Sequence, residues 1–156
     1  MSGATEPSRI VVTRAGLHTT VQDAGRWGYQ HVGVPVGGAL DLAALRRANA
    51  LVGNHPDEAG LEVTLVGCAL RAEGPACVAV TGARFAVSVN GVSVPQDEAL
   101  TLAPGDELVL GARLHGARAC VAVRGGLQLP LVLGSRSAWP LAPRRGALAD
   151  TGAPGL

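Results

Sequence analysis

The sequence predicts a mainly β fold, a barrel of short strands with one principal helix at residues 42–52. From Leu61 onward, short runs rich in β-branched and apolar residues alternate with turn residues. The apolar run CVAV occurs at residues 77–80 and again at 120–123, and such runs are typical of strands covered on both faces, as in a closed barrel. A single segment carries both the start and the stop signals of a long helix.

The first predicted elements are a strand and the helix. RIVVTR, at residues 9–14, predicts a short strand. In DLAALRRANALVGN, Asp41 is a typical N-cap and Gly53 followed by Asn54 supplies a left-handed stop, so the helix should span residues 42–52.

The rest of the chain predicts strands and turns. Asn90-Gly91 is a strong signal for a two-residue hairpin turn, and Pro104-Gly105-Asp106 marks a second turn. The runs that predict strands are LEVTLVG, ACVAVTGA, FAVSV, VSV, EALTLA, ELVLGA and ACVAVRGG.

A chain of 156 residues has room for one domain with a sizeable core. We expect residues 1–8 to be disordered and residues 9–137 to form the barrel domain. Residues 138–156 should form an irregular tail, because prolines and glycines interrupt every possible period there.

Composition argues against several classes of partner. The formal net charge is +1 and no run of basic residues occurs, so neither nucleic acid nor an anionic membrane is an expected partner. No apolar run approaches the ~18 to 20 residues that span a bilayer, and the first residues lack a signal-peptide pattern, which predicts a cytoplasmic protein. The four histidines show no metal-ligand spacing, and the three cysteines sit among aliphatic residues, as reduced core thiols do.

The stretch VQDAGR contains the first candidate site residues, Gln22, Asp23 and Arg26. Its glycines let backbone approach a ligand closely, so a carboxylate and a guanidinium could serve a small polar or carboxylate-bearing substrate. The alternative is that Asp23 and Arg26 pair with each other and staple a loop over the barrel mouth, which Trp27 and Tyr29 would plug. Spacing alone favours this second interpretation.

The predicted helix contributes Asn49 and Arg46. At 100° per residue, Asn49 lies on the same face as Leu42, Leu45 and Val52, so its amide should point inward and need hydrogen-bond partners. A structural network and a clamp on a substrate amide explain it equally well. Arg46 falls at the margin of that face.

Polar residues also alternate along the LEVT strand, where Glu62 and Thr64 share one face. Buried inside a barrel they would be costly without a purpose, whereas on its outside they are ordinary. The glycine-rich segments RGG at 124–126 and GSRS at 134–137 could bind anions or simply form turns.

Eight segments in order resemble a known family. They are GLHTTVQDAGRWGYQHVGVP, GGALD, RRANALVGN, LEVTLVG, VTGA, PGDEL, AVRGG and LGSRS. This series is similar to the C subunit of 5-oxoprolinase, also called allophanate hydrolase subunit 2, of the biotin-dependent carboxyltransferase family. The resemblance implies a cyclophilin-like β-barrel and activity only together with companion subunits, which would supply ATP and, in urea carboxylase, carboxybiotin.

The substrates of that family are small amides, namely 5-oxoproline or urea. By match to the motifs, the resemblance assigns Arg26 and Arg46 to oxyanion or carboxylate binding, and Gln22 and Asn49 to hydrogen bonding of the amide. Proton handling falls to Asp23 or Glu62, with Thr64 as a further substrate contact. The chain itself is expected to bind no metal and no cofactor.

The sequence also departs from the family. Relatives run to roughly twice this length, with a second barrel-like half after the GSRS segment, so this chain resembles the amino-terminal half only. It is therefore expected to be inactive alone. Two alternatives remain: a regulatory module that binds a partner of the kinase-inhibitor type, or an inactive gene remnant.

Overall fold

The structure is a computed structural model that describes residues 9–139. The predictions made for residues 1–8 and 140–156 lie outside the described residues. Among the described residues, no helix is both long and apolar enough to cross a membrane.

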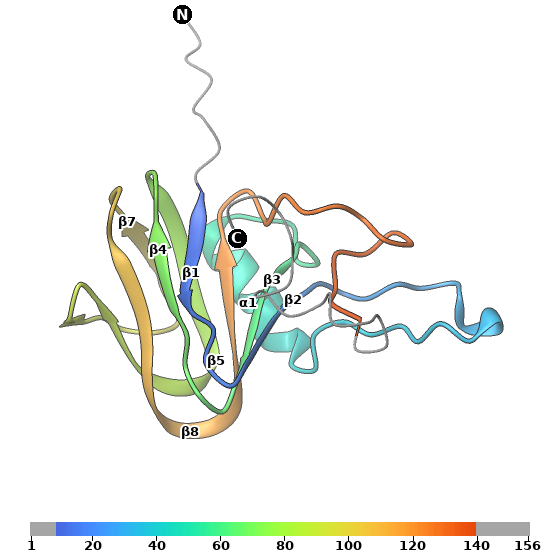
Figure 1. The fold of residues 1–156 in the computed structure, drawn as a ribbon, viewed down its shortest axis with the longest axis horizontal. Helices are drawn as coiled ribbons and strands as arrows, with labels where there is room; N and C mark the ends of the chain where they lie inside the picture. The colour runs from blue at the N-terminus through green and yellow to red at the C-terminus, as the bar shows by residue number, and fades with distance from the viewer. Residues whose placement is uncertain (1–8, 140–156) are drawn as a thin grey trace, which may run out of the picture.

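Within residues 9–139, one α-helix and a curled antiparallel sheet make up the fold (Figure 1). The helix α1 (Leu42–Val52) is 11 residues long, and a short 3-10 helix η1 (Gln30–Val32) lies in the loop before it. The strands are β1 (Ile10–Arg14), β2 (His18–Gln22), β3 (Gly60–Thr64), β4 (Ala69–Ala72), β5 (Ala76–Val89), β6 (Val92–Ser93), β7 (Ala99–Leu102) and β8 (Glu107–Val123).

The mainly β, cyclophilin-like fold with one principal helix is confirmed. Asp41 caps α1 by accepting a 3.0 Å hydrogen bond from the Ala44 N–H, and Gly53 ends it in the left-handed conformation. At the hairpin between β5 and β6, Asn90 and Gly91 both have positive φ, as a type I′ turn requires. Local sequence signals therefore determine these element boundaries.

Two long strands, β5 and β8, replace several of the short strands expected from sequence. ACVAVTGA and FAVSV are one strand, and ELVLGA and ACVAVRGG are another. The register of the β5–β8 pair shifts between Gly82 and Val87, so bulges bend both strands without interrupting them. Gly82 makes this possible, because its φ is +89° and a Cβ there would lie 2.7 Å from the Arg118 carbonyl oxygen.

The sheet order is β1-β4-β8-β3-β2, with β5 pairing along β8 and also carrying β6 and β7. The bend in β8 lets its first half pair with β4 and its second half with β3, which curls the sheet into a half barrel. Strands β2 and β4 were not expected from sequence: β2 is rich in threonine and β4 has only four residues, so neither has a strong pattern of its own.

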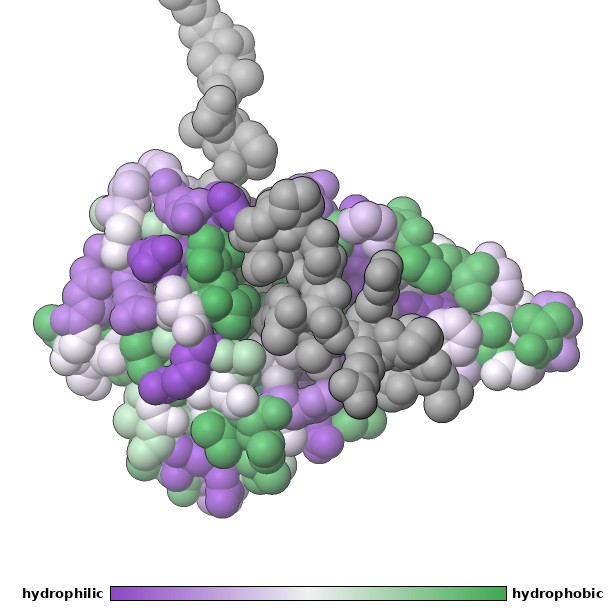
Figure 2. All heavy atoms as spheres, in the orientation of Figure 1, coloured by the Kyte–Doolittle hydropathy of each residue, from purple (hydrophilic) through white to green (hydrophobic). Residues whose placement is uncertain are grey.

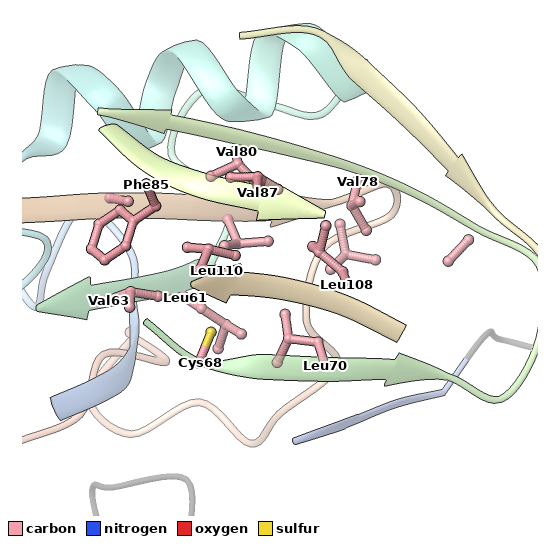
Figure 3. Close-up of a cluster of buried hydrophobic side chains, with 14 of the residues drawn as sticks. Leu61, Val63, Cys68, Leu70, Val78, Val80, Phe85, Val87, Leu108 and Leu110 are labelled. Atoms are coloured by element: carbon pink, nitrogen blue, oxygen red, sulfur yellow. The ribbon is translucent and has the colours of Figure 1, made fainter. Parts of the chain in front are cut away.

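The inner face of the curled sheet holds the hydrophobic core. Leu61, Val63, Leu70, Val80 and Leu110 converge there from strands far apart in sequence (Figure 3). Cys68 belongs to the same cluster and Cys120 is also buried, both as free thiols, whereas Cys77 is half-buried. The outer face of β5 and β8 is covered by α1, whose Ala48 and Val52 pack on Ala79 and Ala122.

Two loops leave the sheet on the same side, residues 24–40 and residues 124–138 (Figure 1). They carry exposed apolar side chains, some of which colour this projecting side green in Figure 2. The exposed large apolar residues of the two loops are Trp27, Val32, Leu40, Leu131, Val132 and Leu133.

Candidate functional site

The seven candidate residues do not gather at one point. Asp23 and Arg26 contact residues 132–139, Glu62 and Thr64 lie on the sheet face near the start of α1, and Arg46 and Asn49 contact residues 56–58. Gln22 ends β2, between the first two groups.

The Asp23 carboxylate is buried and accepts four hydrogen bonds. The Ser135 and Ser137 hydroxyls each donate to Oδ1 at 2.6 Å, and the Gly25 N–H donates to it at 2.8 Å. The Arg136 N–H donates to Oδ2 at 2.6 Å. The GSRS segment therefore does hold an anion, and that anion is the side chain of Asp23.

These hydrogen bonds determine the charge state of Asp23. Burial alone would raise the pKa of this carboxyl, but the donors from Ser135, Ser137, Arg136 and Gly25 together hold its pKa below the ordinary value of 3.8. A carboxylate so stabilised is a weak proton acceptor at neutral pH. Its geometry suits an anchor that joins the loop after β2 to the segment after β8.

The Arg26 side chain is only 2% exposed. Its Nη2 donates to the Ser137 carbonyl oxygen at 2.6 Å, Nε makes a 3.5 Å contact with the Val132 carbonyl oxygen, and the guanidinium lies over the Trp139 ring at 5.7 Å. Nη1 is buried without a hydrogen-bond partner. A buried donor left unpaired costs about 1 to 3 kcal/mol, so this atom calls for a functional explanation.

Asp23 and Arg26 do not form the direct pair expected from their spacing. Among the described residues, none of the ion pairs joins them, and both instead bind Ser137, Asp23 at the hydroxyl and Arg26 at the carbonyl. Trp27 does not plug a barrel mouth either, because it is 68% exposed and its Nε1 donates to the Ala24 carbonyl oxygen.

Glu62 lies on the other face of the β2–β3–β8 sheet from the core, beside the start of α1. It is 5% exposed, and its Oε1 accepts a 2.9 Å hydrogen bond from the Asp41 N–H. Its Oε2 lies 3.9 Å from Arg118 Nε, beyond hydrogen-bond distance. Compared with Asp23, this carboxylate is buried to a similar degree but has far fewer donors.

The strand register places further polar residues around Glu62. Thr20, Glu62, Cys120 and Thr81 are successive cross-strand partners on β2, β3, β8 and β5, so they form one row on the same sheet face. Thr64 and Arg118 are partners in the next such row. Arg118 was not identified from the sequence, and only this register brings it to Glu62.

A pocket of about 330 Å³ opens beside these residues. Its lining consists of Leu40, Asp41, Ala83, Gly116, Ala117 and Arg118. Two of these residues, Asp41 and Arg118, contact the Glu62 carboxylate. The volume is at the lower end of the range for small-ligand sites. A guanidinium and a carboxylate next to each other could bind the oxygen and the N–H of a small amide.

Asn49 belongs to a structural network. Its amide nitrogen donates to the carbonyl oxygens of Pro56 and Glu58, and its amide oxygen accepts from Asn54, so it holds the loop after α1. Arg46 forms a largely exposed ion pair with Asp57 at 2.8 Å on the same loop. The geometry thus favours the structural interpretation of Asn49 over the substrate clamp.

Gln22 donates to the Thr20 hydroxyl at 3.0 Å, while its Oε1 is buried without a hydrogen-bond partner. Residues 20 and 22 are two positions apart on β2, so their side chains point to the same face of the sheet. Because Thr20 is the cross-strand partner of Glu62, the free Gln22 Oε1 lies on the same face as Glu62. Within residues 9–139, no group of three or more His, Cys, Asp or Glu side chains could hold a metal ion.

The fold and this site agree with a carboxyltransferase-type domain. The family model "carboxyltransferase domain, subdomain A and B" matches residues 32–149. The chain belongs to this carboxyltransferase domain family, which confirms the resemblance seen in the sequence.

Individual relatives point the same way. The C subunit of 5-oxoprolinase from Escherichia coli strain K12 is 40% identical over 128 residues, which are 82% of this chain and 41% of the relative. Urea amidolyase of Lachancea kluyveri is 39% identical over 137 residues, 87% of this chain and 8% of the relative. The crystal structure of Kluyveromyces lactis urea carboxylase superposes with a TM-score of 0.82 at 37% identity, covering 88% of this chain and 12% of that one. The chain thus spans less than half the length of each of these relatives.

Proposed function

We propose that this chain is the carboxyltransferase-type component of a multi-subunit, ATP-dependent system that acts on a small amide, of the 5-oxoprolinase or urea carboxylase/allophanate hydrolase kind. The match to the C subunit of 5-oxoprolinase and to urea carboxylase supports this. ATP, and biotin if the system uses it, would be bound by companion subunits. A cytoplasmic location stays a prediction.

The observation that carries the proposal is the Glu62–Arg118 pair next to the pocket. Amide chemistry needs a donor to the carbonyl oxygen, where negative charge develops, and a group that handles the N–H proton. In our proposal Arg118 is the donor and Glu62 handles the proton. We prefer Glu62 to Asp23 for this role because Asp23 already accepts four hydrogen bonds.

Reconstitution tests the proposal. The chain is assayed alone and with companion subunits and the second half of a longer relative, for ATP-dependent formation of glutamate from 5-oxoproline and for urea-dependent ATP hydrolysis. We expect no activity from the chain alone. In the reconstituted system Glu62→Gln should lower turnover by about 10² to 10⁴, the range typical of a general acid–base group.

Glu98→Gln is the matched control, since Glu98 is an exposed carboxylate that does not line this pocket. Robust turnover by the chain alone would contradict the component proposal. Full activity of Glu62→Gln in a working reconstituted system would remove Glu62 from the chemistry.

A further inference from the structure

A group of exposed apolar side chains lies at the end of the barrel where β8 bends, apart from the two projecting loops. Two of its members are in the turn between β3 and β4, one is in the turn between β1 and β2, and one is in the bend itself, residues 111–116. Figure 2 shows green atoms among purple ones at the lower end of the molecule, where Figure 1 places the bend of β8. The members of this barrel-end patch are Leu17, Leu65, Val66 and Leu114.

The barrel-end patch has a fixed shape because backbone contacts hold its turns together. A Cβ on Gly16 would lie 2.4 Å from the Val66 carbonyl oxygen, so the first turn rests directly on the second. The Leu65 N–H donates to the Ala117 carbonyl oxygen at 2.9 Å, which ties the second turn to β8 beside the bend. Leu65 also has a φ of +60°, a conformation that leucine rarely adopts. The stability of the chain alone does not explain an exposed leucine in a strained turn, so we look to a contact with another molecule.

The charge at this end of the barrel is positive. Arg14 and Arg113 are exposed there, and none of the ion pairs among residues 9–139 involves either of them. Their guanidinium groups instead contact backbone carbonyl oxygens of β8, that of Leu110 at 3.5 Å and that of Gly116 at 2.9 Å. The segments that form this end, residues 10–18, 63–72, 82–88 and 108–118, contain no Asp or Glu. An apolar surface bordered by unpaired cations is complementary to a partner that carries apolar and acidic side chains.

The patch also adjoins the pocket beside Glu62. Gly116, Ala117 and Arg118 line that pocket, and they follow Leu114 closely along the bend of β8. A protein seated on the barrel-end patch would therefore reach the mouth of the pocket. This position favours a protein that takes part in the chemistry of the pocket over an unrelated one.

We propose that the barrel-end patch docks a segment of a companion subunit that carries apolar and acidic side chains. The proposal rests on the function proposed above, because that function defines the companion subunits. The apolar side chains supply contact area that leaves water, and Arg14 and Arg113 pair with carboxylates at the rim. Rim charges act mainly on association and on its dependence on salt, whereas the apolar centre determines most of the affinity.

Binding of the purified companion subunits to the full 156-residue chain, measured by calorimetry, tests the apolar part of the surface. Leu114→Glu should raise the Kd at least about tenfold, because it places a charge in the apolar centre. Val92→Glu is the matched control, since both side chains are 68% exposed but Val92 lies on β6, outside the patch. Equal effects of the two substitutions, or no binding of any companion subunit to the unaltered chain, would overturn the proposal.

A second pair of variants tests the acidic character of the partner. Arg113→Glu should weaken binding, and added salt should weaken binding of the unaltered chain more than that of this variant, because salt screens pairs at an exposed rim. Arg71→Glu is the control, since Arg71 is an exposed arginine on β4 that lies outside the bend. Binding that does not depend on salt, or that Arg113→Glu leaves unchanged, would contradict an acidic partner.

Other occupants of the patch would give different results. Self-association of the chain in sedimentation experiments that is lost in Leu114→Glu would assign the patch to a second copy and overturn the proposal. Binding to vesicles of phosphatidylserine and phosphatidylcholine that is lost in the same variant, with unchanged binding of companion subunits, would assign it to a membrane and overturn the proposal as well.

The outcome also separates this surface from the function proposed above. Binding of companion subunits that depends on Leu114, without turnover in the reconstituted system, would support the surface and reject the function. Turnover that depends on Glu62, with companion subunits that bind Leu114→Glu as tightly as the unaltered chain, would support the function and reject the surface.

Discussion

The two buried carboxylates, Asp23 and Glu62, are almost equally hidden from solvent at 8% and 5% exposure, yet their surroundings differ. Asp23 accepts four hydrogen bonds, one from the nearby Gly25 N–H and three from residues 135–137, which are distant in sequence. Glu62 accepts one from the start of α1 and has a guanidinium at 3.9 Å. Burial alone therefore does not identify a reactive group, whereas the number of donors already bound separates an anchor from an available carboxylate.

The largest expected effect is the loss of the Asp23 anchor. Asp23→Ala removes an acceptor for two buried serine hydroxyls and two backbone N–H groups, so we expect the free energy of unfolding to fall by about 3 to 5 kcal/mol in urea titrations. Asp57→Ala is the control, because its pair with Arg46 is largely exposed and should contribute no more than about 0.5 kcal/mol. Similar losses in the two variants would mean that Asp23 is no anchor.

Acid titration examines the same anchor by its charge. The folded-state pKa of Asp23 is depressed, so its contribution to stability is fully present above the ordinary pKa of 3.8 and is lost as the pH falls below that value. Between about pH 5 and 8, Asp23 should therefore contribute nothing to the pH dependence of the melting temperature. Below about pH 4 the melting temperature should fall, and it should fall less steeply in Asp23→Asn. If the melting temperatures of the wild type and of Asp23→Asn fell equally in acid, this would argue against a depressed pKa of Asp23.

Local signals in the sequence predicted the helix correctly, since Asp41 and Gly53 act on their immediate neighbours. The predicted lengths of β5 and β8 were wrong, because turn-like residues such as Gly82 can also form bulges within a strand. Whether such a residue ends the strand or bends it depends on the strand that pairs with it. Asn49 was correctly placed on the buried helix face, but its role depended on carbonyl groups that follow the helix.

The candidate site was harder to predict because its contacts are long-range. Asp23 was predicted as a candidate site residue and the GSRS segment as a candidate anion-binding segment, but its two serines lie 112 and 114 residues after Asp23 in the chain. No spacing rule connects such positions. Arg118 had no local signal at all, and its proximity to Glu62 follows only from the β3–β8 register.

A smaller effect on stability is expected when Glu62 is neutralised. In Glu62→Gln the amide oxygen can still accept the Asp41 N–H, and the Arg118 side chain is partly exposed although its Nε is buried, so the guanidinium keeps contact with water. We expect the free energy of unfolding to change by no more than about 1 kcal/mol. A loss as large as that of Asp23→Ala would show that Glu62 is also an anchor, and would remove the distinction between the two carboxylates.

The smallest expected effect uses Cys120 as a reporter of the charge on Glu62. Cys120 is the cross-strand partner of Glu62; burial raises the pKa of its thiol, and the negative charges of Glu62 and Asp41 raise it further. Glu62→Gln removes one of these charges, so the thiolate fraction and the alkylation rate of Cys120 should rise. Because burial is the main cause and remains, we expect an increase of no more than about tenfold, corresponding to one pKa unit.

Alkylation at pH 9, resolved by peptide mass spectrometry, measures the rate at Cys120, with the half-buried Cys77 as the internal control. An unchanged or slower rate at Cys120 would show that the Glu62 carboxylate does not act on this thiol as the proposed arrangement requires.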